Sequence, residues 1–438
     1  MFRSFAVLST LLNQKVLTSS YNISGQTLYI GTETDYNNYE SDLIDKVLEY
    51  NITKIVINAD GWSNTDLAYY GYFDTIQEVV FQGNDAITVE SLFSGNEYIQ
   101  KVTFDTPNIV NISDNCFTNS SIKSVNITLV PQVGMYCFYG CQYLQEIICP
   151  KLQRIPQGFA SFAGSLTTVD ISGATQIDPN AFSYCQSLTQ ITFSSNITNI
   201  SDNAFAYSAI TSIEFPNSIE NIGNGAFMNT LLGTVTFPNW VVTGNLTIQK
   251  QAFTGTQIQT LLVPNYVTFV DDSNSVTGYF SESYNLTSIE IDLIEIPAGF
   301  AMNCFALTTL KAPYCEVIKS YAFFHCKLLE TITLSSAINS IGSYSFAYCH
   351  KLSYTLPSQN ITFGDYSFIY CHNVIFDEVN SQWSLGMYDF VGCEGITQLR
   401  VNSTLTSSNI GCFQGCPNIK SIQVDTNFIP SYFFANCV

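Results

Sequence analysis

Apolar positions recur with one spacing along most of this 438-residue chain, and Asn180–Asn203 shows the pattern most plainly. Phe182 is followed three residues later by Cys185, and an apolar stretch then leads to Ile191 and Phe193. A polar turn follows, after which Ala-Phe begins the next unit. The spacing between successive aromatic anchors averages about 23 residues, a period typical of repeat proteins. The anchors are Tyr70, Phe93, Phe117, Phe138, Phe159, Phe182, Phe205, Phe227, Phe253, Phe280, Phe300, Phe323, Phe346, Phe368, Phe390, Phe413 and Phe434.

Each unit predicts one short strand, a turn, and a single helical turn that carries the anchor. Alternate residues of a strand point to the same side, so paired apolar positions should face inward. Asn, Ser, Asp and Pro supply the turn, and Asp, Ser or Asn before Ala suits one α-helical or 3₁₀ turn. We therefore predict an α/β solenoid with a parallel strand face and short helical or 3₁₀ turns opposite, because stacked units bury what one unit cannot. The inward pairs are Ile191 with Phe193, Ile213 with Phe215, Ile289 with Ile291, Ile332 with Leu334, and Ile422 with Val424.

The beginning of the chain does not follow the repeat. Ser41–Tyr50 has apolar residues at helical spacing, and Asn51–Asn58 alternates apolar and polar residues as a strand does. Terminal units of a solenoid cover the end of its core and are usually atypical. Residues 1–65 are thus predicted to form an N-terminal cap, and residues 66–438 the solenoid.

Two neighbouring units, between residues 227 and 280, are longer than the others and contain Trp240. Their extra residues are either tolerated variation in loop length or a functional projection from the stack. The last unit has no strand after Phe434, so we expect an open C-terminal edge through which the array could self-associate.

The repeated line AFSYCQSLTQITFSSNITNISDNAF, with its echoes YSFAYCHKL, YSFIYCHNV and GAFMNTLLGTVTFP, resembles the BspA-like leucine-rich repeat family. The resemblance covers roughly residues 70–438. It implies a solenoid with a parallel strand face. Members of this family occur in bacteria and protists, commonly as cell-surface proteins with adhesive or binding roles. The resemblance is specific for the repeat and not for a ligand.

The amino-acid composition limits the classes of partner that the protein can bind. The hydrophobic fraction of 46% excludes general disorder, and the formal charge of −20 argues against nucleic acid and against a polybasic membrane patch. No apolar run reaches the roughly 18–20 residues that a membrane-spanning helix needs. The N-terminal stretch has an early Arg3 and an interrupted apolar patch, which is too short and too broken to predict a secretion signal.

Most of the 14 cysteines occupy two positions of the repeat, which require a small buried residue. Stacked side chains at equivalent positions point the same way, so we expect free thiols rather than disulfides. Cys304 is one position out of this register. Three cysteines directly precede the anchor, where Ala is usual: Cys116, Cys137 and Cys412. Eight cysteines follow the anchor by three residues: Cys141, Cys185, Cys326, Cys349, Cys371, Cys393, Cys416 and Cys437.

The three histidines, His325, His350 and His372, fall in three consecutive units, each beside a cysteine. A metal site needs about four converging ligands, and no C-x-x-C or H-x-x-x-H spacing supports one. The simpler interpretation is that the cysteines pack in the core and the histidines point outward. We therefore predict no metal and no cofactor, with the Cys/His cluster at 325–372 as the alternative.

The outward positions of the strand face form a hydroxyl-rich, mildly acidic surface. Its carboxylates are dispersed, one to a unit, so they offer no acid/base pair of defined geometry. No phosphate-binding, dinucleotide-binding or nucleophile-elbow motif occurs either. The face is either a solvated sheet surface or an extended binding surface of the kind that solenoids present. The candidate binding residues are Asp105, Asp170, Glu214, Trp240, Glu290, Asp292 and Arg400.

These observations predict a non-enzymatic protein-interaction or adhesion solenoid, with a protein, an extracellular matrix or a host surface as its partner. The resemblance supplies the adhesive part and the cell-surface or extracellular location. The alternative is an intracellular scaffold of the same fold, in the cytoplasm, which the unpaired cysteines favour. An enzyme or metal protein that uses the histidines is the third hypothesis.

Overall fold

The computed structural model describes residues 21–30, 46–47, 49–58, 75–83, 87–89, 93–105, 109–238, 245–270, 278–376, 378–379, 383–401 and 405–437. The chain divides into two compact units, each with most of its contacts within itself. Unit 1 comprises Met1–Ile200 with Tyr207–Ala209, and unit 2 comprises Ser201–Ala206 with Ile210–Val438. Two predicted positions, the anchor Tyr70 and the binding candidate Trp240, lie outside the described residues.

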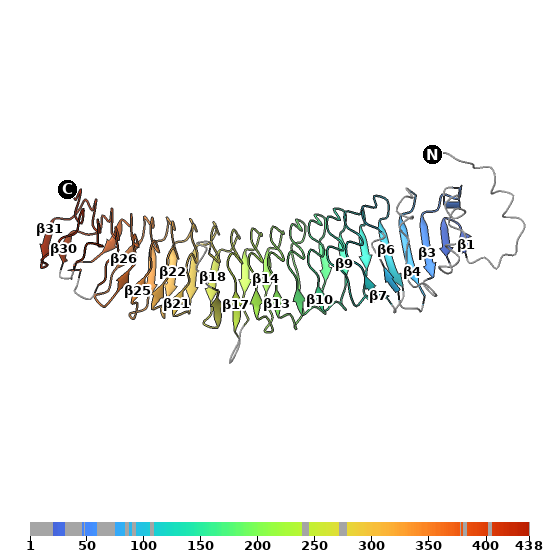
Figure 1. Cartoon of the computed structure of the whole chain (residues 1–438), viewed down its shortest axis with the longest axis horizontal. Coiled ribbons are helices and arrows are strands. Elements are labelled where there is room, and N and C mark those ends of the chain that lie inside the picture. The colour runs from blue at the N-terminus through green and yellow to red at the C-terminus, as the bar shows by residue number, and fades with distance from the viewer. Residues whose placement is uncertain are drawn as a thin grey trace, which may run out of the picture. The chain divides into compact units, whose positions relative to one another are not determined.

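In unit 1 successive strands lie side by side (Figure 1). The first sheet has the order β1-β2-β3-β4-β6-β8-β9-β11, in which β1 and β2 form an antiparallel hairpin and the later neighbours pair in parallel. Further parallel ladders join β5 to β7, and β10 to β12 and β13. The strands are β1 (Tyr21–Ser24), β2 (Thr27–Ile30), β3 (Lys54–Asn58), β4 (Glu78–Gln82), β5 (Ile87–Val89), β6 (Lys101–Asp105), β7 (Ile109–Ile112), β8 (Ser124–Asn126), β9 (Glu146–Ile148), β10 (Arg154–Ile155), β11 (Thr168–Asp170), β12 (Gln176–Ile177) and β13 (Asn199–Ile200).

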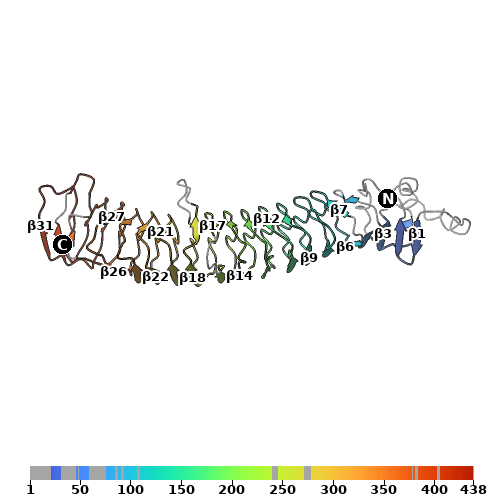
Figure 2. The ribbon, with the colours of Figure 1, turned by 90° about the horizontal axis from the view of Figure 1, so that it is seen from below.

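Unit 2 repeats this plan with parallel pairs. One side of its coils carries β14-β16 and then β18-β20-β22-β24-β26-β28, and the other carries β15-β17-β19 and then β21-β23-β25-β27. Figure 2 shows β18, β22 and β26 along one side and β17, β21 and β27 along the other. The strands are β14 (Ser212–Glu214), β15 (Asn221–Ile222), β16 (Thr234–Thr236), β17 (Leu246–Ile248), β18 (Thr260–Val263), β19 (Val267–Phe269), β20 (Ser288–Ile291), β21 (Glu295–Ile296), β22 (Thr309–Ala312), β23 (Val317–Ile318), β24 (Thr331–Leu334), β25 (Ser340–Ile341), β26 (Ser353–Thr355), β27 (Thr362–Phe363), β28 (Asn373–Ile375), β29 (Glu378–Val379), β30 (Gln398–Val401) and β31 (Ser421–Val424). The last three form their own ladder, in the order β29-β30-β31.

Alternation along the first strand of each coil turns one row of side chains into the core. On β20, Ile289 and Ile291 are fully buried, whereas Glu290 between them is exposed. Ile213 and Phe215 are buried in the same way around β14. This confirms the predicted solenoid with a parallel strand face.

Two details of the strand prediction are wrong. The template stretch Ile191–Phe193 is not a strand: its apolar residues are half-buried, and the following turn closes on Ser194, whose carbonyl accepts from Ile197 N–H at 3.2 Å. Ile422 is 42% exposed instead of buried. It lies on β31, the outermost strand of its ladder, and one side of β31 pairs with no other strand in the described part of the chain.

A second, two- or three-residue strand in many coils goes unpredicted by the sequence pattern. Its buried residue lies five positions before the anchor, as Ile222 does before Phe227. In unit 2 this residue pairs in register with Ile248, one coil on. A strand of two residues is too short for alternation to reveal it, so only the recurrence of the buried residue could have.

The segment around each anchor is a series of turns and not a helix. Backbone N–H groups of the anchor and of the residue two positions later donate to the next coil: Phe346 to Ser367 O and Tyr348 to Ile369 O, both at 2.9 Å. Residues two before and two after the anchor have positive φ, 56° at Tyr344 and 63° at Tyr348. The left-handed conformation interrupts helical geometry, so the predicted helical or 3₁₀ conformation is wrong, although its place opposite the strands is right.

These ladders correct the anchor register in two coils. The N–H that continues the ladder belongs to Ala160 in one coil and Ala301 in the other, and each donates to the next coil at 2.8 Å. Phe159 and Phe300 therefore stand one residue before the anchor position, where other coils have Ala. Their rings are accordingly turned: Phe138 and Phe159 lie at 89°, whereas in-register rings stack nearly parallel.

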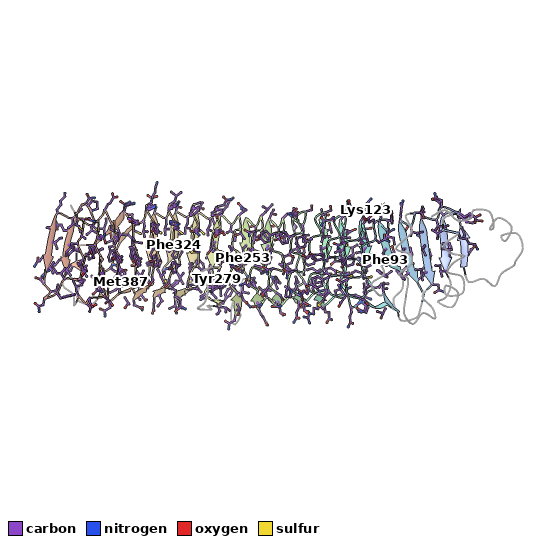
Figure 3. The ribbon with its side chains drawn as sticks, turned by 45° about the horizontal axis from the view of Figure 1, so that its top comes forward. Phe93, Lys123, Phe253, Tyr279, Phe324 and Met387 are labelled. Carbon is purple, nitrogen blue, oxygen red and sulfur yellow. The ribbon has the colours of Figure 1, made fainter. Side chains whose placement is uncertain are left out.

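The anchor rings of unit 2 stack through the core. Phe205, Phe227, Phe253 and Phe280 are fully buried, with neighbouring ring centroids 5.3, 5.5 and 5.2 Å apart and planes within 9°. Figure 3 shows Phe253 within the stack of coils. Each coil thus covers the ring of the one before it, which a single coil could not do.

The thiols three residues after the anchor do more than fill space. Each donates its S–H to the anchor carbonyl of the preceding coil, as Cys371 does to Phe346 O at 3.0 Å. Cys304 makes the same bond to Phe280 O at 3.3 Å, because the anchor of its coil is Ala301. The expectation that Cys304 is out of register is therefore wrong. The equivalent bonds come from Cys141, Cys185, Cys326, Cys349, Cys393, Cys416 and Cys437.

All 14 cysteines are free in the structure, and 13 are buried. Burial raises the pKa of the Cys185 thiol to about 12 and keeps the pKa of Cys349 well above its ordinary range. Ser283 donates to Phe253 O at 3.4 Å from the same repeat position, so a hydroxyl can take the place of the thiol there.

Asp389 is a buried carboxylic acid at the position before the anchor Phe390, where most other coils have Ala, Ser or Cys. It accepts from Gly386 N–H at 2.6 Å and from the Ser367 hydroxyl at 3.1 Å. Desolvation by complete burial nevertheless raises its pKa to about 8. The carboxyl group is thus protonated in the fold at pH values where it is ionised in the unfolded chain.

The segment predicted as a cap is described only in part. Lys46, Val47 and Glu49 are helical, and Tyr50 N–H donates to Lys46 O at 3.0 Å in α-helical spacing. The strand predicted at Asn51–Asn58 is confirmed as β3, which pairs in parallel with both β2 and β4. The boundary at residue 65 stays a prediction.

Replacing Cys371 by Ser should leave the protein more stable than replacing it by Ala. Ser keeps a donor to Phe346 O, and Ala removes it, so the two variants should differ by about 0.5–1.5 kcal/mol in the free energy of unfolding. Urea unfolding followed by circular dichroism measures the difference. An Ala variant as stable as the Ser variant would show that only small volume matters at this position.

Replacing Asp389 by Asn should raise stability more at pH 8 than at pH 5. The folded-state pKa lies above the unfolded value, so the native protein binds the extra proton and loses stability as pH rises from about 4 to 8. Between the two pKa values the loss is about 1.4 kcal/mol per pH unit. Parallel urea titrations of both proteins remove the background from other charges. An equal gain at both pH values would contradict the raised pKa.

Candidate interaction faces

The outward side chains of the first strands form one exposed surface in each unit, here called the first-strand face. In unit 1 it comprises the outward residues of β6, β8, β9 and β11, and in unit 2 those of β18, β20, β22, β24, β26 and β28. Parallel neighbours are about 4.8 Å apart, so equivalent residues form straight rows across the strands.

In unit 1 the first-strand face is mixed in charge. At its edge, Glu78 lies between Lys54 and Lys101, at 3.4 and 3.2 Å. Asp105 is exposed at the end of β6, and Asp170 accepts Ser172 N–H at 3.0 Å. Because β6 and β11 are three strand steps apart, these two candidates are separated by at least about 14 Å. They cannot act as one acid/base pair.

In unit 2 the first-strand face carries a row of hydroxyl groups in strict register, Thr260, Ser288, Thr309, Thr331 and Ser353. A parallel row combines exposed apolar residues with charges. It begins with Leu262, which is 58% exposed, and continues with Glu290, Lys311 and Thr333. Such a surface can bind a partner by apolar contact and hydrogen bonding.

The remaining candidates are dispersed over unit 2. Glu214 is exposed on β14, and Arg400 on β30 forms an ion pair with Asp425 at 3.1 Å. Glu290 lies 3.8 Å from Lys311 on the first-strand face. Asp292 is only two residues from Glu290 but lies beyond the end of β20, where it lines a cavity on the other side of the coil. The structure therefore does not bring these residues together.

The histidines and cysteines of the cluster point in different directions. His325 stacks on Phe324, with ring centroids 4.7 Å apart, whereas the thiol of Cys326 is buried and bonds a carbonyl. His350 and His372 stack on each other at 5.2 Å, and His372 Nδ1 is 2.9 Å from a Glu394 oxygen. Within the described ranges, no three His, Cys, Asp or Glu side chains gather as a metal site would require. The Cys/His metal hypothesis thus has no support from geometry.

Sequence reasoning missed a row of stacked tyrosines on the turn segments of unit 2. The rings of Tyr321, Tyr344, Tyr366 and Tyr388 follow one another at 4.9, 4.7 and 5.2 Å, with planes within 15°. Tyr344, Tyr366 and Tyr388 pack against a small apolar cluster of Ala347, Ile369 and Val391, as Phe324 and Tyr348 also do. The sequence feature that could have revealed this row is the recurrent Tyr-Ser-Phe at 344–346 and 366–368. Because each ring covers its neighbour's face, this row is explained by packing.

Among the described residues, no helix is both long enough and apolar enough to span a bilayer.

One solved structure supports the fold, and two further structures are similar with lower TM-scores. A leucine-rich repeat protein from Bacteroides ovatus is 21% identical, with a TM-score of 0.52, over 69% of this chain and 86% of that chain. A leucine rich cell surface protein from Faecalibacterium prausnitzii is 18% identical, with a TM-score of 0.35, over 93% of this chain and 94% of that one. The pneumococcal vaccine antigen PcpA is 13% identical, with a TM-score of 0.33, over 94% and 96%.

No curated protein matches the chain. The family model described as a BspA type leucine rich repeat region, of six copies, matches residues 66–176, 153–277, 247–375 and 375–438. These matches together cover residues 66–438, well over half of the chain, and include stacked coils of both units. The chain belongs to the BspA-type leucine-rich repeat family.

Proposed function

We propose that this protein is a non-enzymatic interaction or adhesion solenoid that binds a protein partner, an extracellular matrix or a host surface through its first-strand face. The observation that carries the proposal is the row of in-register hydroxyls beside exposed Leu262 and Ile375 in unit 2. Such rows present hydrogen-bonding and apolar groups at fixed spacing, which suits an extended protein surface. Glu290 would tune the charge of that contact in unit 2, and Asp105 and Asp170 would do so on the first-strand face of unit 1. Glu214 on β14 and Arg400 on β30 lie outside the strands that define this face.

We place this function at the cell surface or outside the cell, because binding and adhesion there are common roles of the family. The hydroxyl-rich, mildly acidic surface fits contact with a protein better than with a nucleic acid. Reaction chemistry has no part in the proposal: the carboxylates are dispersed, and burial raises the pKa of the thiols.

A second candidate, an intracellular scaffold of the same fold, is favoured by one observation. All 14 cysteines are free thiols, which is the usual state in a reducing compartment. Their role as buried hydrogen-bond donors weakens this argument, because it explains the cysteines without reference to a compartment.

A photoreactive residue at Thr309 or Thr331 should crosslink to the partner in the native cell, whereas one at Lys351 should not. Thr309 and Thr331 face outward on β22 and β24, and Lys351 is exposed on a turn segment of the same unit. Gel migration and mass spectrometry of the adducts provide the measurement. Equal adducts from all three positions would contradict a role for the first-strand face.

Protease applied to intact cells should degrade the native protein while a cytoplasmic marker stays whole. The experiment separates the two candidates, because an intracellular scaffold is protected until the cells are lysed. The folded solenoid should be cut once denatured, which serves as the control for susceptibility. Protection in intact cells together with rapid cleavage in lysates would contradict the proposed location.

A further inference from the structure

At β18–β21, the coils of unit 2 pair through their strands on one side, but on the other side the described strands do not pair. On the first-strand side, β18 and β20 pair over four residues, from Thr260 with Ser288 to Val263 with Ile291. On the opposite side, β19 is the last strand of its ladder and β21 is the first strand of the next. Two strand edges therefore face the same opening without pairing with each other in the described chain.

A cavity of about 490 Å³ occupies this opening. It is lined from one coil by Thr268 and Phe269 and from the next by Asp292, Ile294 and Glu295. Both strand edges thus border one hollow. Such edges are sites at which an extended peptide can add as a further strand, because main-chain donors and acceptors are already aligned.

The cavity lining combines apolar side chains, here called its floor, with the charged groups of Asp292, Glu295 and Lys319, here called its rim. Phe269 packs edge-on against buried Phe300, with ring centroids 5.5 Å apart, which holds the floor in place. Ile294 is 64% exposed, an unusual position for a large apolar side chain at a hollow. Apolar area for contact is therefore available beside groups that can orient a ligand.

The charges at the rim favour a cationic ligand. Lys319 contributes the only cation among the lining residues and already forms an ion pair with Glu295 at 2.7 Å. Asp292 has no hydrogen bond or ion pair from its carboxylate among the described residues; only its backbone N–H is used, toward Val263 O at 2.9 Å. Among the described residues, the carboxylate of Asp292 is thus available as an acceptor for a partner.

We propose that this cavity binds an extended peptide segment of another protein, which adds as a strand between β19 and β21 and places a basic side chain on Asp292. Apolar side chains of the segment contact Ile294 and Phe269, while its backbone pairs with the strand edges. A second copy of this chain fits less well, because its formal charge of −20 opposes an acidic rim. The site lies on the side of the coil away from the first-strand face and does not depend on the function proposed for that face.

Fluorescence anisotropy with labelled eight-residue peptides tests the proposal. A peptide of alternating Val and Lys should bind the full-length protein, and peptides of alternating Val and Glu or Val and Ser should bind at least tenfold more weakly. Asp292→Asn should weaken the Val-Lys peptide about tenfold, the equivalent of one well-placed charge pair. Ile294→Glu supplies an independent variant. It removes the apolar contact of Ile294 with the peptide and should therefore also weaken binding of the Val-Lys peptide.

Glu290→Gln is the matched control, since it removes the same charge two residues away on the opposite side of the coil. It should leave the affinity unchanged, whereas general attraction of a basic peptide to an acidic protein would respond equally to both substitutions. An N-methylated Val-Lys peptide, which cannot donate main-chain hydrogen bonds, should lose binding. Retained binding would overturn strand addition.

Three results would overturn the proposal as a whole. The first is no binding of the Val-Lys peptide at millimolar concentration. The second is equal effects of Asp292→Asn and Glu290→Gln on its affinity. The third is a concentration-dependent dimer, seen by analytical ultracentrifugation and abolished by Ile294→Glu, which would assign the cavity to a second copy of the chain.

Discussion

The contact between equivalent residues of successive coils is the interaction on which the rest of each unit depends. A single coil of about 23 residues cannot bury its own apolar face or satisfy its own backbone. Its anchor ring is covered by the next ring, as Phe346 is by Phe368 at 5.3 Å, and its anchor carbonyl receives a thiol from the next coil. Backbone ladders along the strands and the turns complete the same nearest-neighbour pattern.

This constraint separates the residues available for function from those that are not. Every inward position must match its neighbours in size and polarity, so the cysteines are used for packing and hydrogen bonding, and burial keeps them protonated. Outward positions need only tolerate a row spacing of about 4.8 Å. Differences in side chain from coil to coil are therefore tolerated on the first-strand face and at places where neighbouring coils do not pair. The opening between β19 and β21 is of the second kind, because the ladder on one side of the coil is interrupted while the other continues.

The sequence predicted the parts of the fold that repeat with a clear period. Phe182 and its relatives marked the coils, and Ile289 with Ile291 marked the buried side of a strand. The turns around the anchor were mistaken for helix because Asn and Ala before Phe suit a helix start, whereas positive φ at Tyr344 and Tyr348 reflects a hydrogen-bond ladder between coils. Composition does not reveal that ladder. For the same reason Phe159 was assigned as an anchor, although Ala160 continues the backbone register.

The candidate binding residues were harder to foresee. Alternation placed Glu290 correctly on the first-strand face, but the same reasoning could not show that Asp292, two residues later, lines a cavity on the other side of the coil. That outcome depends on the missing pairing of β19 and β21, a property of two coils and not of one sequence window. The His and Cys cluster failed as a site for a related reason, since adjacency in sequence places His325 outward and Cys326 inward.

Double-mutant cycles on the stacked anchors test the nearest-neighbour account most directly. Phe346→Leu and Phe368→Leu remove rings that stack in adjacent coils, and Phe346→Leu with Phe413→Leu removes rings that do not touch. Urea unfolding should give a coupling free energy of about 0.5–1.5 kcal/mol for the adjacent pair and additivity within about 0.5 kcal/mol for the distant pair. Equal coupling in the two cycles, or none between Phe346 and Phe368, would contradict the claim that each coil is held by the stacking of its immediate neighbours.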